Sequence, residues 1–243
     1  MIAMLERLHR AFVGVTMPER HVIARFIARV AAANPALPTG AVIDIAAGMA
    51  PYAHALARAF PGRDQWRADL HAVARPHVAA DAQSLPFRDG SAAVVSLFQA
   101  IQLLDDPARA LAEAHRVLAP GGLLILTYPL MQAETTNHDL WRWTNQGFAR
   151  LLDGAGFEMV ETRAHGGVAY MATYSLALLP LLYLVRNRQG WRTGRSVADM
   201  VRLALATALS TPFNLLGFAA LAIDRILPTG AFAPHINLAA RRK

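Results

Sequence analysis

The chain has 243 residues, enough for one α/β domain with a full hydrophobic core and an additional element. It contains no cysteine, which excludes disulfides and thiolate metal sites. The net charge of +7 suits an anionic membrane surface, whereas no Lys/Arg-rich run is interleaved with aromatic residues, so we predict no nucleic-acid partner. Charged residues in the first ten positions stand where a signal peptide needs its apolar core, which predicts a cytoplasmic protein.

The first buried strand is followed by a turn of small residues. Residues 41–45 are β-branched and apolar around one acid, a pattern typical of a strand covered on both faces. Residues 46–50 read Ala-Ala-Gly-Met-Ala, and such small residues let a ligand approach the backbone. Pro51 suits the first turn of a following helix. The dinucleotide fingerprint needs two further glycines besides Gly48, which disfavours a nicotinamide or flavin oxidoreductase but leaves it as an alternative.

Strands and helices alternate over the following hundred or so residues. The expected strands lie at residues 64–69, 77–81, 92–98 and 123–127, and the expected helices at 107–118 and 145–152. A helical segment is also expected before the first strand, at 1–37. Asp69 ends one strand and follows Gly48 by 21 residues. An acid about 20 residues after such a turn usually binds the hydroxyl groups of a ribose. The pattern therefore predicts an α/β fold that binds a nucleotide-like cofactor.

Six motifs occur in order within residues 38–165. They are D-I-A-A-G at 44–48, the acid Asp69, D-A-Q-S-L-P-F at 81–87, D-D-P at 105–107, R-V-L-A-P-G-G at 116–122 and H-D-L-W-R-W-T at 138–144. With these motifs the chain resembles the class I S-adenosylmethionine-dependent methyltransferases, especially bacterial enzymes that modify small molecules and lipids. The resemblance implies one Rossmann-like domain over residues 1–243 with a doubly wound, mostly parallel, seven-stranded sheet.

The resemblance also implies which residues bind the cofactor, S-adenosylmethionine. They are Asp44, Ala46, Gly48, Asp69, Asp81 and Ala82. Asp44 and Gly48 would lie along its methionine part, Asp69 would bind the ribose hydroxyls, and Asp81 with Ala82 would face the adenine.

Four residues depart from the pattern of the family. Ala46 and Ala50 stand where glycines are usual, and a methyl group there is expected to narrow the cofactor site and to disfavour a positive φ. Gln102 and Leu103 stand where many relatives carry an acid and a base. These departures leave open a non-catalytic, methyltransferase-like subunit that holds a partner enzyme.

A polar and aromatic cluster follows the strand at 123–127. It consists of His138, Asp139, Trp141, Arg142 and Trp143. Loops at the carboxyl ends of strands line the ligand crevice of open α/β sheets, so we expect this cluster to surround the substrate. His138 is the candidate base that takes a proton from the methyl acceptor. The alternative interpretation is structural, with Thr144 as a helix N-cap and Arg142 in an ion pair with Asp139.

Residues 166–230 are an apolar insertion between two strands, expected at 157–162 and 235–241. Its uncharged runs, 166–185 and 203–223, each approach the ~20 residues that span a bilayer. Four arginines at positions 186, 188, 192 and 195 lie between the runs, and both ends return to one sheet, which disfavours spanning.

We expect the insertion to be a helical hairpin that dips into one leaflet of an anionic inner membrane. Pro180 and Pro212 are expected to break its helices, with the arginines among lipid phosphates. The alternatives are a soluble cap or a homodimer surface.

The prediction is thus a cytoplasmic, membrane-associated enzyme that methylates a small-molecule or lipid-linked acceptor. Transfer is expected at oxygen, by direct displacement on S-adenosylmethionine. The nine histidines show no paired spacing of metal ligands, so no metal site is expected.

Overall fold

The computed structural model describes residues 17–71, 75–132, 134, 138–174, 197–227 and 232–243. The chain divides into two compact units. The sheet unit comprises Ile23–Leu130, Asn137–Arg163 and His235–Lys243, and the helical unit comprises Met1–Val22, Met131–Thr136 and Ala164–Pro234.

The sheet unit is built on a seven-stranded sheet with the order β3-β2-β1-β4-β5-β7-β6. The strands are β1 (Ala41–Ile45), β2 (Gln65–Asp69), β3 (Val78–Ala79), β4 (Ala92–Phe98), β5 (Leu118–Pro129), β6 (Phe157–His165) and β7 (His235–Arg242). The pairs among β1 to β5 are parallel, whereas β7 runs antiparallel to β5. The predicted mostly parallel α/β sheet is confirmed, and β5 and β7 form an antiparallel pair in it.

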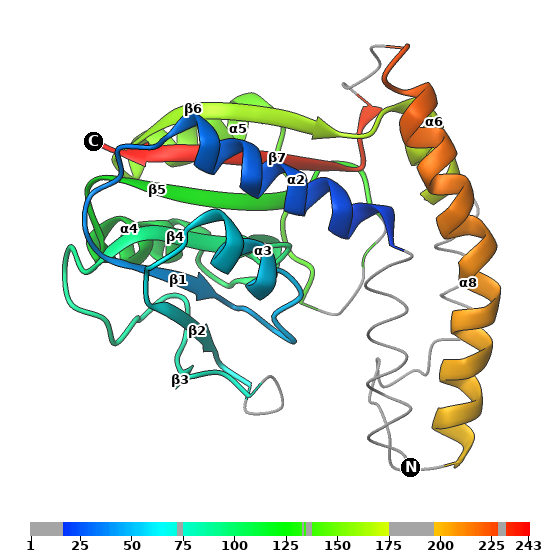
Figure 1. Ribbon diagram of the computed structural model, residues 1–243, viewed down its shortest axis with the longest axis horizontal. Coiled ribbons are helices and arrows are strands. Elements are labelled where there is room, and N and C mark those ends of the chain that lie inside the picture. Colours follow the sequence, from blue (N-terminus) through cyan, green and yellow to red (C-terminus); the bar gives the residue numbers. More distant parts are fainter. Residues whose placement is uncertain (1–16, 72–74, 133, 135–137, 175–196, 228–231) are drawn as a thin grey trace. The chain divides into compact units, whose positions relative to one another are not determined.

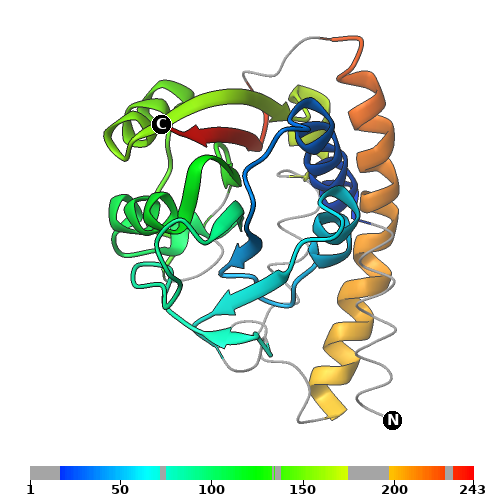
Figure 2. The ribbon, with the colours of Figure 1, turned by 60° about the vertical axis from the view of Figure 1, so that its left-hand side comes forward.

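Helices cover both faces of the sheet (Figures 1 and 2). One face carries α3 (Ala53–Ala59) and α2 (Pro18–Ala33), whose residues from Ile23 onward belong to the sheet unit. The opposite face carries α4 (Pro107–Val117) and α5 (Asn145–Gly154). Successive side chains of a strand point to opposite faces, so the fully buried strand β4 contributes to both hydrophobic cores.

The ends of these elements follow local sequence signals. The Thr144 side chain accepts a hydrogen bond from the Gly147 N–H at 3.1 Å, which confirms the predicted N-cap of α5. Strand β5 starts earlier than predicted, because the Pro-Gly-Gly expected in a loop lies within the strand. A Cβ on Gly122 would lie 2.9 Å from the Ala119 carbonyl oxygen, so only glycine fits this part of the strand.

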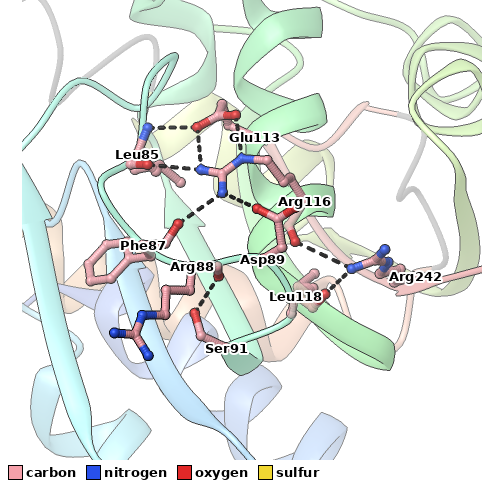
Figure 3. A network of polar contacts seen from close by, with 9 residues as sticks. All are labelled: Leu85, Phe87, Arg88, Asp89, Ser91, Glu113, Arg116, Leu118 and Arg242. Carbon is pink, nitrogen blue, oxygen red and sulfur yellow. Dashed lines mark hydrogen bonds and ion pairs between the residues drawn. The ribbon is translucent and has the colours of Figure 1, made fainter.

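Arg116 of α4 ties this helix to the segment that precedes β4 (Figure 3). Its guanidinium donates to the carbonyl oxygens of Leu85 (2.8 Å) and Phe87 (2.9 Å) and forms ion pairs with Glu113 and Asp89. Glu113 in turn accepts the Leu85 N–H at 2.7 Å. Two of the six sequence motifs, at 81–87 and 116–122, therefore meet in one network that supports the fold.

The helical unit contains α6 (Val168–Met171) and α8 (Val197–Ile223). Asp224, just after α8, accepts the N–H groups of Gly167 (2.7 Å), Ala169 (3.0 Å) and Tyr170 (2.9 Å). Its carboxylate thus holds the start of α6 against the end of α8, because these N–H groups have no partner within the helix itself.

Pro212 lies inside α8, and the prediction that it breaks the helix is wrong. Proline removes one backbone hydrogen bond, but α8 continues for several turns on both sides of it, and their bonds maintain the helix. Pro180 and the four arginines of the insertion lie outside the described residues. Among the helices that the structure describes, none combines the length and the apolar character needed to cross a membrane.

Candidate active site

The turn after β1 has an unusual backbone conformation. Ala46, Gly48 and Ala50 have φ values of 49°, 53° and 50°. Left-handed geometry costs a non-glycine residue about 1–2 kcal/mol, so the two alanines hold the conformation expected of glycine at some cost in stability. A Cβ built on Gly48 would meet no heavy atom within 4 Å, and the space beside the turn is therefore open.

Asp69, at the end of β2, contacts this turn directly. Its Oδ2 accepts the Gly48 N–H at 2.8 Å, and its Oδ1 accepts the His71 N–H at 2.8 Å. An ionised carboxylate offers about four lone-pair sites, so two remain for hydroxyl groups. The turn and the acid thus form a fitting cradle for a ribose.

Asp44 lies in β1 and is almost fully buried, with 3% of its surface exposed. The Ser96 hydroxyl of β4 donates to its Oδ1 at 2.7 Å. Burial raises the pKa of Asp44 from 3.8 to about 7, although the Ser96 hydrogen bond and the charge of Arg67 oppose this rise. Ser96 is not among the residues that the sequence predicted for the site, although its hydroxyl in the middle of the apolar run 92–98 is a signal for such a role.

The raised pKa of Asp44 predicts a pH-dependent stability. The contribution of protonated Asp44 to the free energy of unfolding is fully present below the ordinary pKa of 3.8. It is lost as the pH rises from about 4 to about 7. Asp44→Asn keeps an oxygen that can accept the Ser96 hydrogen bond but cannot ionise. It should therefore abolish the decrease in the free energy of unfolding with rising pH, a decrease on the order of 4 kcal/mol. Denaturant unfolding between pH 4 and pH 8, about the range set by the two pKa values, measures the effect. The exposed Asp64→Asn is the control, and an Asp44→Asn curve with the wild-type slope would contradict the prediction.

Asp81 and Ala82 follow β3. The Asp81 Oδ1 accepts the Gln83 N–H at 2.9 Å, which closes a tight turn. Ala82 is buried, with 6% of its surface exposed, and packs in the core. The side-chain oxygen of Gln83 accepts the Asp106 N–H at 2.7 Å and so links this turn to the start of α4.

The segment 138–143 is attached to the turn that follows β4. This turn contains the short 3-10 helix η2 (Ile101–Leu103). The Leu140 N–H donates to the Gln102 carbonyl at 2.9 Å, and the Trp141 indole N–H donates to the Leu104 carbonyl at 2.8 Å. The segment is thus fixed at the carboxyl end of β4, the strand beside β1.

Within this segment the charged and aromatic residues pair with one another. Asp139 and Arg142 form a two-pronged ion pair at 2.5 and 2.9 Å, and the Asp139 side chain is only 1% exposed. This is the ion pair that the structural interpretation of Arg142 expected. The rings of Trp141 and Trp143 stack with centroids 6.0 Å apart, and His138 is exposed at the start of the segment.

The structure therefore joins Gly48 to Asp69 and places the 138–143 segment on the turn after β4. Both groups lie at the carboxyl edge of the parallel strands, where open α/β sheets bind their ligands. Over the described part of the chain, no three side chains are grouped as metal ligands.

Residues 39–126 match the family model described as "Methyltransferase domain". The chain is 34% identical over 124 residues to the malonyl-[acyl-carrier protein] O-methyltransferase of Alcanivorax borkumensis, a match that covers 45% of this chain and 42% of that enzyme. It is 27% identical over 180 residues to the ubiquinone/menaquinone biosynthesis C-methyltransferase UbiE of Burkholderia mallei, covering 65% of this chain and 68% of that enzyme. Residues 39–126 therefore form a methyltransferase domain, similar to those of S-adenosylmethionine-dependent methyltransferases.

Several solved structures share the fold of this chain. A protein from Galdieria sulphuraria assigned as a sarcosine dimethylglycine methyltransferase has a TM-score of 0.58 at 15% identity, over 92% of this chain and 85% of that one. The [4+2]-cyclase SpnF has a TM-score of 0.54 at 19% identity, over 90% and 80%. At these identities the likeness concerns the fold alone. The methyltransferase domain implies S-adenosylmethionine as the methyl donor and favours methyl transfer over the oxidoreductase alternative.

Proposed function

We propose that this methyltransferase transfers the methyl group to a hydroxyl oxygen of a small-molecule or lipid-linked acceptor. The observation that carries the proposal is the attachment of residues 138–143 to the turn after β4, next to the strand that precedes the Gly48 turn. Similarity to an O-methyltransferase supports oxygen as the acceptor atom, and similarity to a C-methyltransferase makes carbon the alternative.

In this proposal the cofactor is held at the carboxyl ends of β1, β2 and β3. S-adenosylmethionine supplies a methyl group on a positively charged sulfur. Asp69 would bind the ribose through its remaining lone pairs, with the turn over residues 44–48 along the methionine part. Asp81 and Ala82, which follow β3 after one intervening residue, would face the adenine.

The acceptor would lie against residues 138–143. Its oxygen would take the methyl group that the cofactor supplies, and the electron pair of the broken carbon–sulfur bond would remain on sulfur. His138 takes the hydroxyl proton, and its exposed position leaves it able to pass that proton to water. The stacked Trp141 and Trp143 would exclude water from the acceptor, and the ion pair between Asp139 and Arg142 would keep the segment in place.

The position of the transferred methyl group tests this proposal. The purified protein is incubated with methyl-labelled S-adenosylmethionine and a bacterial lipid extract, and the product is treated with alkali. A methyl ether retains the label, whereas a methyl ester of a carboxylate loses it. Carbon-13 NMR separates a methyl group on oxygen from one on carbon or nitrogen. A product labelled on carbon would contradict O-methylation while leaving the family assignment intact.

We also propose that the insertion at 166–230 rests on the anionic cytoplasmic leaflet of the inner membrane. Several large apolar side chains of α8 and the residues after it are about half exposed or more, namely Leu205, Leu215, Leu216, Ile223, Ile226 and Leu227. The sequence places arginines at 186, 188, 192 and 195 in the same insertion, and a basic residue near an anionic surface contributes about 1 kcal/mol. A soluble cap and a homodimer surface are the competing arrangements.

Liposome binding tests the membrane proposal. The protein should sediment with anionic liposomes at low salt and less at high salt, because screening weakens the basic contribution. Replacing Leu215 and Leu216, which are 59% and 55% exposed, by glutamine should weaken sedimentation severalfold or more. Met159→Gln, at a 40% exposed position of β6, is the matched control. Wild-type protein that stays in the supernatant at low salt would exclude the membrane, and a dimer in sedimentation equilibrium would favour the dimer surface.

A further inference from the structure

The residue that follows β4, Gln99, has a strained backbone. Its φ is 52°, in the left-handed region that a residue with a long side chain seldom adopts. The Gln99 N–H donates to both the side-chain oxygen (3.0 Å) and the carbonyl (3.1 Å) of Thr127 in β5. Strain of this kind persists where the surrounding structure holds it, and it concentrates at functional sites.

Gln102 is linked to Gln99 and is itself buried. Its Nε2 donates to the Gln99 carbonyl at 2.9 Å, which fixes the orientation of the amide because the opposite orientation would set two oxygens against each other. Only 5% of the Gln102 surface is exposed. The backbone carbonyl of Gln102 accepts the Leu140 N–H, so the residue also anchors the 138–143 segment.

Each of these glutamines has one buried polar side-chain atom without a hydrogen-bond partner among the described residues. The Gln102 Oε1 and the Gln99 Nε2 have no hydrogen-bond partner among the residues that the structure describes. Leaving a buried amide group unsatisfied costs about 1–3 kcal/mol, and buried polar groups in folded proteins nearly always have a partner. The turn after β4 thus carries a hydrogen-bond donor, the Gln99 Nε2, and an acceptor, the Gln102 Oε1, that have no partner among the described residues. This turn follows the strand that pairs with β1, which leads to the Gly48 turn.

We propose that Gln99 and Gln102 bind the hydroxyl group of the methyl acceptor. The Gln99 Nε2 donates to the acceptor oxygen, and the Gln102 Oε1 accepts its O–H. A hydroxyl satisfies both amides because it is donor and acceptor at once. A carboxylate has no proton for Gln102, and an ammonium group has no lone pair for Gln99. This inference rests on the proposed O-methylation and identifies the residues that select its substrate class.

The two amides orient the hydroxyl but take no proton from it, because a neutral amide is a very weak base. The oxygen lone pair that forms the new bond to carbon is distinct from the one that accepts from Gln99. As the new bond forms, the hydroxyl proton turns from its hydrogen bond with the Gln102 Oε1 and is transferred from the acceptor oxygen to His138, the base of the proposed function. The pair thus acts on binding and alignment of the acceptor, and its loss should raise KM for the acceptor more than it lowers affinity for the cofactor.

Binding of three matched probes tests this inference. The probes are para-hexylphenol, para-hexylbenzylamine and para-hexylbenzoate, each titrated calorimetrically into protein saturated with S-adenosylhomocysteine. The phenol should bind about tenfold or more tighter than the other two, since only the phenol satisfies both amides. Equal or tighter binding of the amine or the carboxylate, or no detectable binding of the phenol, would overturn the inference.

Two variants locate the effect at the glutamines. Gln102→Met keeps the side-chain length without an amide, and Gln99→Asn tolerates the left-handed backbone but withdraws the donor by one methylene. Each should weaken phenol binding about tenfold and leave the affinity for S-adenosylhomocysteine within twofold. Gln146→Met, at an exposed position of α5, is the matched control. Unchanged phenol binding in both variants would contradict the assignment even if the thermal midpoint shifts.

The labelled-product experiment separates this inference from the function on which it rests. If wild-type protein forms a labelled methyl ether and both glutamine variants form it with the wild-type KM, the inference fails and O-methylation stands. If the label appears on carbon or nitrogen, O-methylation fails whatever the glutamine variants do.

Discussion

Asp69→Ala is expected to weaken S-adenosylmethionine binding by about 1.5–3 kcal/mol, roughly tenfold to a hundredfold. The Asp69 carboxylate holds the Gly48 and His71 N–H groups and is expected to accept the ribose hydroxyls as well. Alanine removes both the cofactor contact and the hydrogen bond that shapes the turn. Isothermal titration calorimetry measures the loss.

Two comparison variants distinguish a direct role of Asp69 from a general effect on the fold. Asp81→Ala should weaken binding less, because its carboxylate already closes its own turn at Gln83. Asp64→Ala, at an exposed site before β2, should have no effect. Wild-type affinity in Asp69→Ala would exclude this residue from the cofactor site, whereas a loss shared equally by all three variants would indicate damage to the fold.

His138→Ala is expected to lower kcat by roughly a hundredfold to ten-thousandfold while cofactor affinity stays unchanged. The reason is that His138 is the proposed acceptor of the hydroxyl proton, and the segment that carries it is fixed to the turn after β4. Steady-state kinetics with the labelled cofactor measure the effect.

Replacing another histidine provides the control for His138. His54 lies on α3 and contacts Arg58, so His54→Ala should leave kcat unchanged. Arg142→Ala should mostly raise KM for the acceptor, because the ion pair with Asp139 holds the segment that carries the tryptophans. Equal, small losses in His138→Ala and Arg142→Ala would mean that the segment has only a structural role.

The order of the central elements in the sheet unit could be predicted because β1 and β4 are apolar runs bounded by turn residues. The buried runs at 41–45 and 92–98 and the acid that ends β2 appear in the structure where the sequence places them. The spacing of Asp69 from Gly48 predicted a ribose-binding acid, and the structure adds a direct hydrogen bond between these two residues.

Other features depend on contacts that no local pattern contains. Proline disfavours the interior of a helix, yet the helical turns on both sides of Pro212 keep α8 continuous. Ala46 and Ala50 adopt positive φ because the surrounding turn, closed by Asp69, determines their conformation more strongly than their own preference. The start of β5 was misjudged because the Pro-Gly-Gly sequence is usual in loops, whereas here it lies within the strand, at an irregularity in its register with β4.

The candidate site also combines features that the sequence predicts with features that depend on contacts in the folded chain. The spacing after Gly48 pointed to Asp69 as a cofactor residue, and the resemblance to the family supplied the other candidates. The roles of Ser96, Gln99 and Gln102 depend on hydrogen bonds between strands and on burial, which the sequence does not express. Gln102 was noted only as a departure from the family, and its buried, unused oxygen is visible only in the folded chain.

Formation of S-adenosylhomocysteine by the purified protein is the most direct test of the account. The protein, S-adenosylmethionine and a bacterial lipid extract are incubated together, and S-adenosylhomocysteine and methylated product are quantified by mass spectrometry. We expect the two products in equal amounts, formation that requires the extract, and loss of both in His138→Ala. Tight cofactor binding without S-adenosylhomocysteine in any extract would contradict the catalytic account and identify the chain as a non-catalytic methyltransferase-like subunit.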